Sequence, residues 1–400
     1  MDSLTQIVLG AAVSEAALGK KIGNRAMVWG AIAGTIPDLD VVSNLFMTPI
    51  QSLAFHRGIT HSALIDLLLA LGMGFIVHKM YAWHNHKWVG MTSWLILLIF
   101  VTLTPSLVSG LSVFGVVWSL IFGGIGGWLV YHRYQRPGYK TAEASIWEWQ
   151  WMFILALVTH PILDCFTTYG TQILLPFSTD RVSFNNIAVA DPAYTLPFLT
   201  CVIIAMFYKK DDPKRRFWNY LGLTISSLYM LFTIYNKSKI NTIFTESLDS
   251  QGIIYNRYMT SPTILNNVLW TGIAETDSAY YYGSYSFFDK EKKINFNKLK
   301  KSDQSFSQGL SNDPTLKTLR WFSNDYFILE QANQDSLKYY DLRFGTFRTS
   351  EKSEDKFVFN FDIQREGDTY TLLNQGNGPK DTKIGEIFKV LWRRMMGNVD

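Results

Sequence analysis

The stretch ITHSALIDLLLALGMGFIV (residues 59–77) joins a histidine-bearing loop to a long apolar run. A membrane-spanning helix needs roughly 17 to 25 mostly apolar residues, and this run approaches that length. Two further runs are shorter and rich in Gly and Ala, which lets helices pack closely. The pattern predicts an α-helical membrane bundle of about six to eight membrane helices. The other runs lie at 93–109, 111–131, 147–163, 192–208 and 217–235, and the two short ones at 4–19 and 26–36.

The composition divides the chain into two parts. Only 18% of the residues are charged, against about 25% in ordinary soluble domains. The apolar runs all end by residue 235, and the rest is polar and rich in Tyr, Asn, Asp and Lys. We therefore predict a polytopic membrane metal-site domain (1–235) and a C-terminal soluble α+β domain (236–400). In the second domain we expect strands, for example at Ala279–Ser286, and helices near Ser261–Gly272 and Gly309–Asn324.

The basic residues indicate an orientation in a membrane. The net charge of +4 is small, and Lys and Arg occur in short loops between apolar runs rather than in a stripe. That pattern speaks against a nucleic-acid partner. Because basic loops stay in the cytoplasm, we expect a multi-pass topology with the polar clusters and the C-terminal domain on the opposite, periplasmic or extracellular side. Cys165 and Cys201 show neither metal spacing nor a disulfide framework.

The first polar cluster is HPILD, which begins at His160. His160 and Asp164 are four residues apart, so on a helix they lie on one face, one turn apart. Both side chains could then reach one metal ion. The alternative is a buried hydrogen bond between them that stabilises the helices.

The second cluster is FHRGITHS (residues 55–62). His56 and His61 are five residues apart, so they cannot share a helix face, but a loop at Gly58 could turn both inward. Thr60 or Ser62 could cap the following helix, whose N-terminus favours an anion. Arg57 adds a fixed charge suited to a phosphate. The alternative is a loop whose His and Arg side chains face lipid headgroups.

Two acidic sites complete the candidates. In PDLD (residues 37–40), Asp38 and Asp40 follow a Gly-rich run, and one could bind a metal while the other orients a histidine. Paired aspartates are also common in plain turns. Glu15 lies inside an apolar run, where a carboxylate is costly unless paired, so it is a candidate ligand or general base.

These motifs resemble a known family. The segments MDSLTQIVLGAAVSEA (1–16), GAIAGTIPDLD (30–40), FHRGITHS (55–62) and HPILDCFTTYGTQILLPFS (160–178) look like the membrane-bound metal-dependent hydrolases of the YdjM/YbcI type. The resemblance covers residues 1–208 and implies a bacterial inner-membrane enzyme. Many relatives place a histidine where this chain has Gln6, so the N-terminal ligand stays open, with Glu15 as a possible substitute. The metal ligands that it implies are Asp38, Asp40, His56, His61, His160 and Asp164.

The family is also distantly similar to zinc-dependent phospholipase C and nuclease P1 type enzymes, which favours phosphoester substrates. We therefore expect a divalent metal ion, zinc or alternatively manganese, and hydrolysis of a phospholipid or another amphiphilic, lipid-linked phosphoester. A spare carboxylate would accept the proton, and Arg57 with nearby hydroxyls would hold the oxyanion. The expected base is Glu15 or Asp40, and the expected hydroxyls are those of Thr60, Ser62 or Thr168.

A non-enzymatic alternative stays open. The helices could form a metal-stabilised scaffold or a transport protein that presents the C-terminal domain to an envelope partner. A cavity with a free coordination position would favour the enzyme. The sequence determines neither the substrate nor the oligomeric state.

Overall fold

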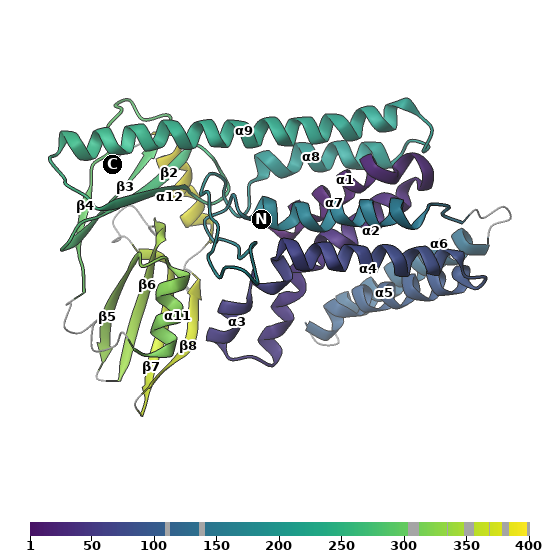
Figure 1. Ribbon diagram of the computed structural model, residues 1–400, viewed down its shortest axis with the longest axis horizontal. Helices are drawn as coiled ribbons and strands as arrows, with labels where there is room; N and C mark the ends of the chain where they lie inside the picture. Colours follow the sequence, from purple (N-terminus) through teal and green to yellow (C-terminus); the bar gives the residue numbers. More distant parts are fainter. Residues whose placement is uncertain are drawn as a thin grey trace.

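The computed structural model has a helical N-terminal part and a β-rich C-terminal part, joined by one long helix (Figure 1). The structure describes residues 1–108, 113–135, 141–302, 312–333, 335–347, 356–367, 369–377 and 384–397. The long helices lie side by side, and the sheets lie at one end of them. The helical part contains α1 (Ser3–Ile22), α2 (Asn24–Thr35), the 3₁₀ helix η1 (Pro37–Leu45), α3 (Pro49–Phe55), the 3₁₀ helix η2 (Ile59–His61), α4 (Ala63–Ala82), α5 (His86–Val108), α6 (Val113–Gln135), α7 (Ile146–Asp164), α8 (Pro192–Met206) and α9 (Pro213–Ser250).

Capping residues fix where the helices near the polar clusters begin. The side chain of Asp2 accepts a hydrogen bond from the backbone N–H of Thr5 at the start of α1. Ser145 and Glu148 form a capping box at the start of α7, and Ser62 caps α4. These side chains satisfy N–H groups that a helix leaves unpaired. Because Ser62 directly follows His61, the start of α4 also fixes the place of His61.

The helices α1 and α2 approach each other closely, as their Gly and Ala content predicts. A Cβ atom at Gly10 would lie 2.2 Å from the carbonyl oxygen of Gly30, so neither position has room for a side chain. This contact holds the end of α2, and with it η1, against α1. Side chains of α7 then fill the core beside these helices, where Trp149, Met152 and Phe153 are fully buried.

The expected bundle of six to eight membrane helices is wrong. Within the described residues, α4 is the one helix that is both long enough and apolar enough to cross a membrane. α7 buries Trp149, Met152, Phe153 and Leu157 in the protein's own core, and α8 has only 15 residues. α9 continues for 38 residues and enters the polar C-terminal part. Periodicity and composition alone do not separate a buried core helix from a membrane helix, which explains the error.

The C-terminal part contains two four-stranded antiparallel sheets, with strand orders β1-β2-β3-β4 and β5-β6-β7-β8. The second half of α9 packs on the first sheet, where Phe244 lies against Gly272. Helix α11 packs on the second sheet through Leu319 and Phe322. The elements are β1 (Arg257–Pro262), β2 (Leu269–Glu275), β3 (Ala279–Ser286), β4 (Asn297–Lys300), α11 (Pro314–Phe322), β5 (Phe327–Asn333), β6 (Ser336–Phe347), β7 (Lys356–Glu366), β8 (Thr369–Asn377) and α12 (Ile384–Met395).

The helix expected near Ser261–Gly272 is also wrong, because this segment holds the end of β1, a turn and the start of β2. The side chain of Asn266 accepts hydrogen bonds from the N–H groups of Val268 and Leu269, which fixes the turn. A local side-chain acceptor of this kind competes with helix formation. The helix expected at Gly309–Asn324 corresponds to α11, and its first three residues lie outside the described part.

Candidate metal centre

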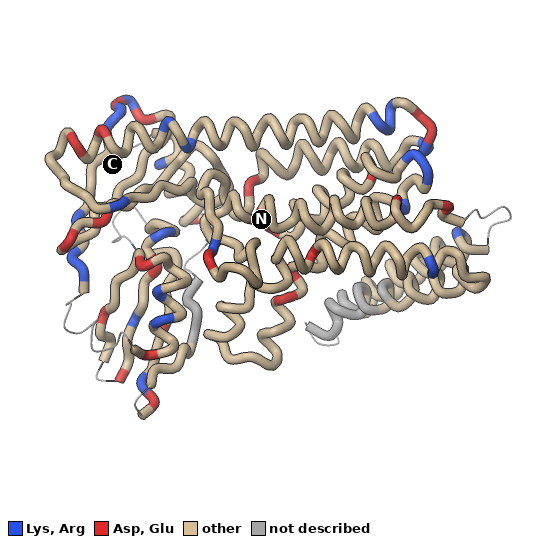
Figure 2. The backbone as a smooth tube through the Cα atoms, viewed as in Figure 1, with Lys and Arg blue, Asp and Glu red and all other residues tan. Residues whose placement is uncertain are grey.

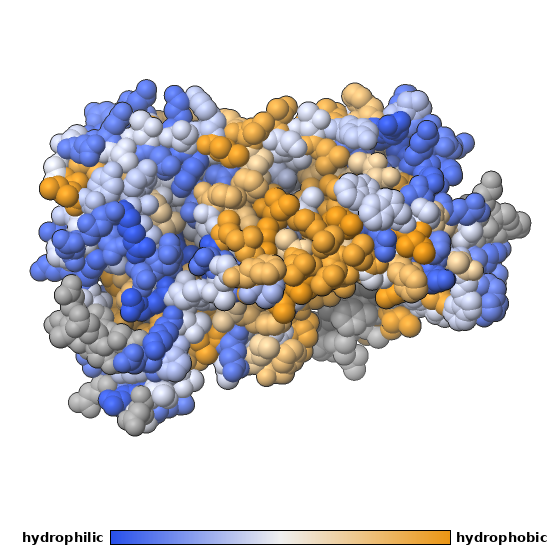
Figure 3. All heavy atoms as spheres, viewed as in Figure 1, coloured by the Kyte–Doolittle hydropathy of each residue, from blue (hydrophilic) through white to orange (hydrophobic). Residues whose placement is uncertain are grey.

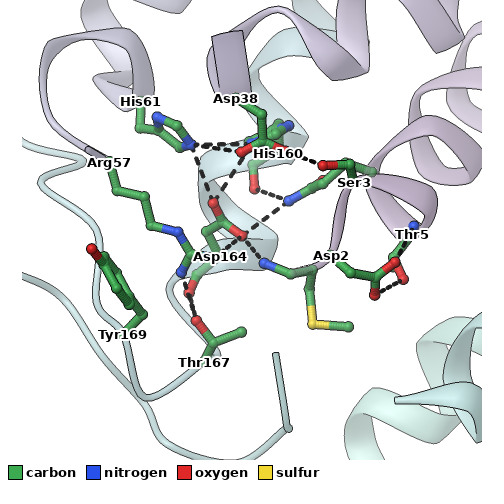
Figure 4. Close-up of polar contacts among 12 residues, drawn as sticks. Asp2, Ser3, Thr5, Asp38, Arg57, His61, His160, Asp164, Thr167 and Tyr169 are labelled. Atoms are coloured by element: carbon green, nitrogen blue, oxygen red, sulfur yellow. Dashed lines mark hydrogen bonds and ion pairs between the residues drawn. The ribbon is translucent and has the colours of Figure 1, made fainter. Parts of the chain in front are cut away.

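Four acidic and histidine side chains converge where η1, η2 and α7 meet (Figure 4). They are Asp38, His61, His160 and Asp164, and one ligand atom of each lies within 4.8 Å of all the others. The two histidine Nε2 atoms are 3.2 Å apart. Oδ1 of Asp38 lies 3.5 Å from each of them, and Oδ2 of Asp164 lies 3.3 and 3.5 Å away. This cluster could hold a metal ion.

In each histidine, the partner of Nδ1 determines whether Nε2, which faces the cluster, has a free lone pair. Nδ1 of His160 lies 2.7 Å from the carbonyl oxygen of Gly34, and a carbonyl can only accept, so Nδ1 carries the proton. Nδ1 of His61 lies 3.5 Å from Oδ2 of Asp40. With protons on both Nδ1 atoms, the two Nε2 lone pairs face each other. That arrangement is favourable when a proton or a cation lies between them.

The spacing of the cluster fits a metal ion. Zinc–nitrogen bonds of about 2.0 to 2.1 Å in a tetrahedron place the ligand atoms roughly 3.3 Å apart. Five of the six ligand-atom pairs are 3.2 to 3.5 Å apart, in agreement with that value, and all six lie within 4.8 Å. Imidazole and carboxylate together suit zinc, and manganese less specifically. Both carboxylates are oriented so that they stabilise positive charge at this point.

The electrostatics of the cluster lead to the same conclusion. Burial acts against charge on Asp38, but hydrogen bonds with His160 and His61 outweigh it and hold the pKa of Asp38 well below its usual range. Burial alone would lower the pKa of His160, whereas hydrogen bonds with Asp164 and Asp38 raise it to about 9. The carboxylates that retain a proton on this ring would equally retain a metal cation.

Asp40 lies behind the cluster rather than in it. Its carboxylate lies 2.8 Å from Nδ1 of His56, and it accepts hydrogen bonds from the backbone N–H of Arg57 at 2.8 Å and from Thr60 at 3.3 Å. It also faces Nδ1 of His61. A carboxylate at the outer nitrogen of a metal-binding histidine fixes the ring and raises its basicity. The geometry therefore gives Asp40 an orienting position. The polar contact of the His56 side chain is with Asp40, and its ring lies edge-to-face with that of His61.

Arg57 is buried, and its guanidinium lies beside the Asp164 carboxylate (Figure 4). Its guanidinium lies 3.3 Å from Oδ1 of Asp164 and donates a hydrogen bond to Thr167 at 2.8 Å. Burial acts to raise the pKa of Asp164, but the positive charge of Arg57 and the α-amino group of Met1, which contacts the same carboxylate, hold it well below the usual range. The Nε atom of Arg57 is buried and has no acceptor within the described residues.

Comparison with known proteins relates this geometry to a family. Residues 1–240 match the description "YdjM inner membrane protein", which is more than half of the chain. The chain belongs to the YdjM inner membrane protein family. It is also similar to the uncharacterised protein YfhP of Bacillus subtilis (strain 168), with 25% identity over 255 residues, 60% of this chain and 71% of YfhP. No solved structure matches it. Membership of the YdjM family supports a location in the inner membrane.

The comparisons do not extend to the finer expectations. Neither match bears on the distant similarity to phospholipase C and nuclease P1 type enzymes, and neither names an activity. In this YdjM-family chain, the cluster lies entirely within the matched residues, whereas both sheets lie beyond them. The family match therefore covers the candidate metal centre but not the two C-terminal sheets.

Two of the hydroxyl groups predicted to hold an oxyanion, those of Thr60 and Ser62, have hydrogen-bond partners in this YdjM-family chain. Thr60 donates to Asp40 and also contacts His61. Ser62 caps α4 and donates to the carbonyl oxygen of Leu175. Thr168 is buried, and it is its neighbour Thr167 that contacts Arg57. Sequence reasoning missed Thr167, although it lies within the motif at 160–178, directly before Thr168.

Glu15 lies away from the cluster. It forms a buried ion pair with Arg215, whose Nε and Nη2 atoms lie 2.6 and 2.5 Å from its two oxygens. Gln6, nine residues earlier on α1 and thus about 14 Å away along the axis, reaches the cluster instead. Its amide donates to Asp164 at 3.1 Å, and its Oε1 atom is buried without a hydrogen-bond partner in the described part. Sequence reasoning missed Arg215, because only the fold reveals this partner.

Proposed function

We propose that the chain is a metal-dependent hydrolase of the inner membrane that cleaves a phospholipid or another lipid-linked phosphoester. The observation that supports it most is the convergence of Asp38, His61, His160 and Asp164, with both Nε2 lone pairs directed at one point. Zinc suits this donor set, with manganese as the alternative. A divalent cation held there would polarise a phosphoester oxygen and lower the pKa of a water molecule.

The surrounding side chains would orient the ligands and balance their charge. Asp40 orients His61, and the carbonyl of Gly34 orients His160. Arg57 offsets the negative charge of Asp164, and its unpaired Nε is the donor that we assign to a phosphoryl oxygen. A planar guanidinium suits this role because it offers several donors in a fixed fork.

The distribution of Lys and Arg supports a proposal about which side of the membrane the cluster faces. The basic loops around Lys21 and Lys210 meet, and Nζ of Lys210 donates to the backbone oxygen of Lys21. Figure 2 shows Lys and Arg gathered at this end of the helices, opposite the sheets. α4 begins beside His61 and carries Lys79 near its other end. Because basic residues flank the cytoplasmic side, we propose that the cluster and the C-terminal domain face the periplasm or the cell exterior.

Metal analysis and a hydrolysis screen test the proposal. Purified protein would be assayed on phospholipids and on chromogenic phosphoesters, with and without a chelator. We expect metal-dependent hydrolysis that His160→Ala abolishes together with bound metal, and that the exposed His84→Ala leaves unchanged. Arg57→Lys should keep the metal but reduce turnover by roughly tenfold or more, because the fork is lost. The enzymatic proposal would be refuted if the protein, fully loaded with metal, hydrolysed none of these substrates.

One observation favours a second function. Four protein ligands complete a tetrahedral shell, which is typical of structural zinc sites. The metal would then stabilise a helical scaffold that presents the C-terminal domain to an envelope partner. Chelation separates the two functions, since the scaffold predicts lower thermal stability and no hydrolysis. An enzyme instead requires that substrate and water reach the metal ion. Asp38 offers the route, because its side chain is 14% exposed while the other three ligands are fully buried.

A further inference from the structure

The segment that supplies Asp38 and Asp40 continues into an exposed apolar turn. Leu45 is 84% exposed and Phe46 72%. Three further apolar side chains of η1 are exposed beside them, at Leu39, Val41 and Val42. Soluble surfaces rarely gather large apolar side chains in one place, and such patches usually mark an interaction site.

The chain that follows Asp40 carries no charge. Between Asp40 and His56 the chain has no Asp, Glu, Lys or Arg over residues 41–55. We call residues 37–55, comprising η1, the turn and α3, the η1–α3 hairpin. Charged side chains are the groups that are costly to bring into lipid. The turn of this hairpin could therefore enter an apolar phase without burying an ion.

The hairpin is fixed on its other sides. Asp40 is buried against His61 of the cluster, and Ser43 is buried as well. Ile50 and Leu53 of α3 pack into the core formed by α11 and the second sheet, which includes Phe322. The exposed apolar face is thus the outer surface of an anchored element. Figure 1 shows the hairpin projecting sideways where the helices meet the sheets.

The position of the hairpin matches the end of the candidate membrane span. Ile59 of η2 is exposed beside it, and α4 begins at Ala63, four residues later. In Figure 3 the apolar surface over the helices extends towards this hairpin, whereas both ends of the molecule are hydrophilic. The exposed face therefore lies at the depth where α4 would leave the lipid.

We propose that the η1–α3 hairpin inserts its exposed apolar side chains into the outer part of the lipid layer, so that the candidate metal centre lies at the lipid–water boundary. These side chains are Leu39, Val41, Val42, Leu45 and Phe46. The partner is the membrane itself, because the face is apolar, uncharged and continuous with the apolar surface around α4. This inference rests on membership of an inner-membrane family and holds whether or not the cluster is catalytic. For a hydrolase, it would give the site direct access to lipid headgroups.

Fluorescence quenching tests the insertion. Phe46→Cys would be labelled with an environment-sensitive fluorophore, and the full-length protein placed in nanodiscs of zwitterionic and anionic phosphatidyl lipids. We expect strong quenching by lipids with a nitroxide on the acyl chain and several-fold weaker quenching by aqueous iodide than at a control label. The control is Ile254→Cys, because Ile254 is 88% exposed in the C-terminal part. Leu45→Cys provides a second label position if the first variant folds poorly.

A variant with a charge at position 46 tests whether the apolar character of the turn is needed for insertion. Phe46→Asp, combined with a label at Leu45, should restore iodide quenching while metal content stays at the wild-type level. Iodide quenching at position 46 equal to that at Ile254 would overturn the proposal. Protection from both quenchers would also overturn it, and would indicate that another protein surface, such as a second copy of the chain, covers the face.

Discussion

Replacing Asp40 by asparagine separates the residues that bind a metal from the residue that orients them. The Asp40 carboxylate lies 2.8 Å from the backbone nitrogen of Arg57, 2.8 Å from Nδ1 of His56 and 3.5 Å from Nδ1 of His61. Asparagine keeps the size of the side chain and one acceptor oxygen, but it replaces the second oxygen with a donor. It also removes the negative charge behind His61.

The structure sets the expected magnitude. Loss of a group that orients a metal ligand typically costs about 10- to 100-fold in metal affinity, which is about 1.4 to 2.7 kcal/mol. Because Asp40 faces His61 at 3.5 Å rather than at a short hydrogen-bond distance, we expect the lower end, about tenfold. The remaining oxygen can still accept from the N–H of Arg57, but the amide nitrogen cannot accept from Nδ1 of His56, so the free energy of unfolding should also fall by about 1 to 3 kcal/mol.

A zinc competition titration against a fluorescent chelator measures the effect. We expect wild type and His84→Ala to bind alike, Asp40→Asn to bind about tenfold more weakly, and His160→Ala to show no tight binding. Thermal unfolding in excess chelator checks that each variant folds. Wild-type affinity in Asp40→Asn would refute the orienting role, and a loss as complete as in His160→Ala would make Asp40 a ligand.

Three further predictions concern other parts of the chain. Glu15→Gln leaves the charge of Arg215 buried and unpaired, so denaturant unfolding should show a loss of about 3 to 5 kcal/mol, and a loss no larger than that of a surface substitution would contradict the role of the pair. A cysteine at Ile254 should react with an impermeant thiol reagent in intact cells, whereas one at Asp211 should react only after lysis; the reverse pattern would place the cluster in the cytoplasm. Burial lowers the pKa of Lys237 to about 7, so above that pH the unfolded chain binds a proton that the folded chain does not, and stability rises with pH up to about 10. Thermal unfolding between about pH 7 and about pH 9 should therefore show a rise that Lys237→Met lacks.

Local spacing predicted part of the site. The four-residue interval between His160 and Asp164 places both on one face of α7, because helix geometry depends only on nearby residues. The sequence also suggested that one of Asp38 and Asp40 binds a metal while the other orients a histidine. Which aspartate takes which position was not predictable, since that depends on where η2 packs against η1. Glu15 illustrates the same limit, because its partner is 200 residues away in the sequence.

The positions of the helices were predictable, but their environment was not. The apolar runs at 147–163 and 192–208 correspond to α7 and α8. An apolar run indicates only that its side chains are kept from water. A protein core and a lipid bilayer both provide such an environment, so the sequence pattern does not distinguish them. The turn around Asn266 was missed for a related reason, because a side chain that bonds its own backbone leaves no periodic signal.

The continuity of α9 has a consequence for dissecting the protein. The helix runs unbroken for 38 residues, a length of about 57 Å, and both the expected domain boundary at 235 and the end of the family match at 240 fall inside it. Its last turns supply Ile243, Phe244 and Leu248 to the interior of the first sheet. A C-terminal fragment that begins after residue 250 would therefore lack the helix that covers the first sheet. A fragment that begins just before residue 236 would keep that part of α9, but the other helices that α9 packs against would be missing. In a fusion or an exchange of the C-terminal half, the number of residues in this helix would have to be kept. Each added or removed residue would change both the rotation and the distance between the two halves.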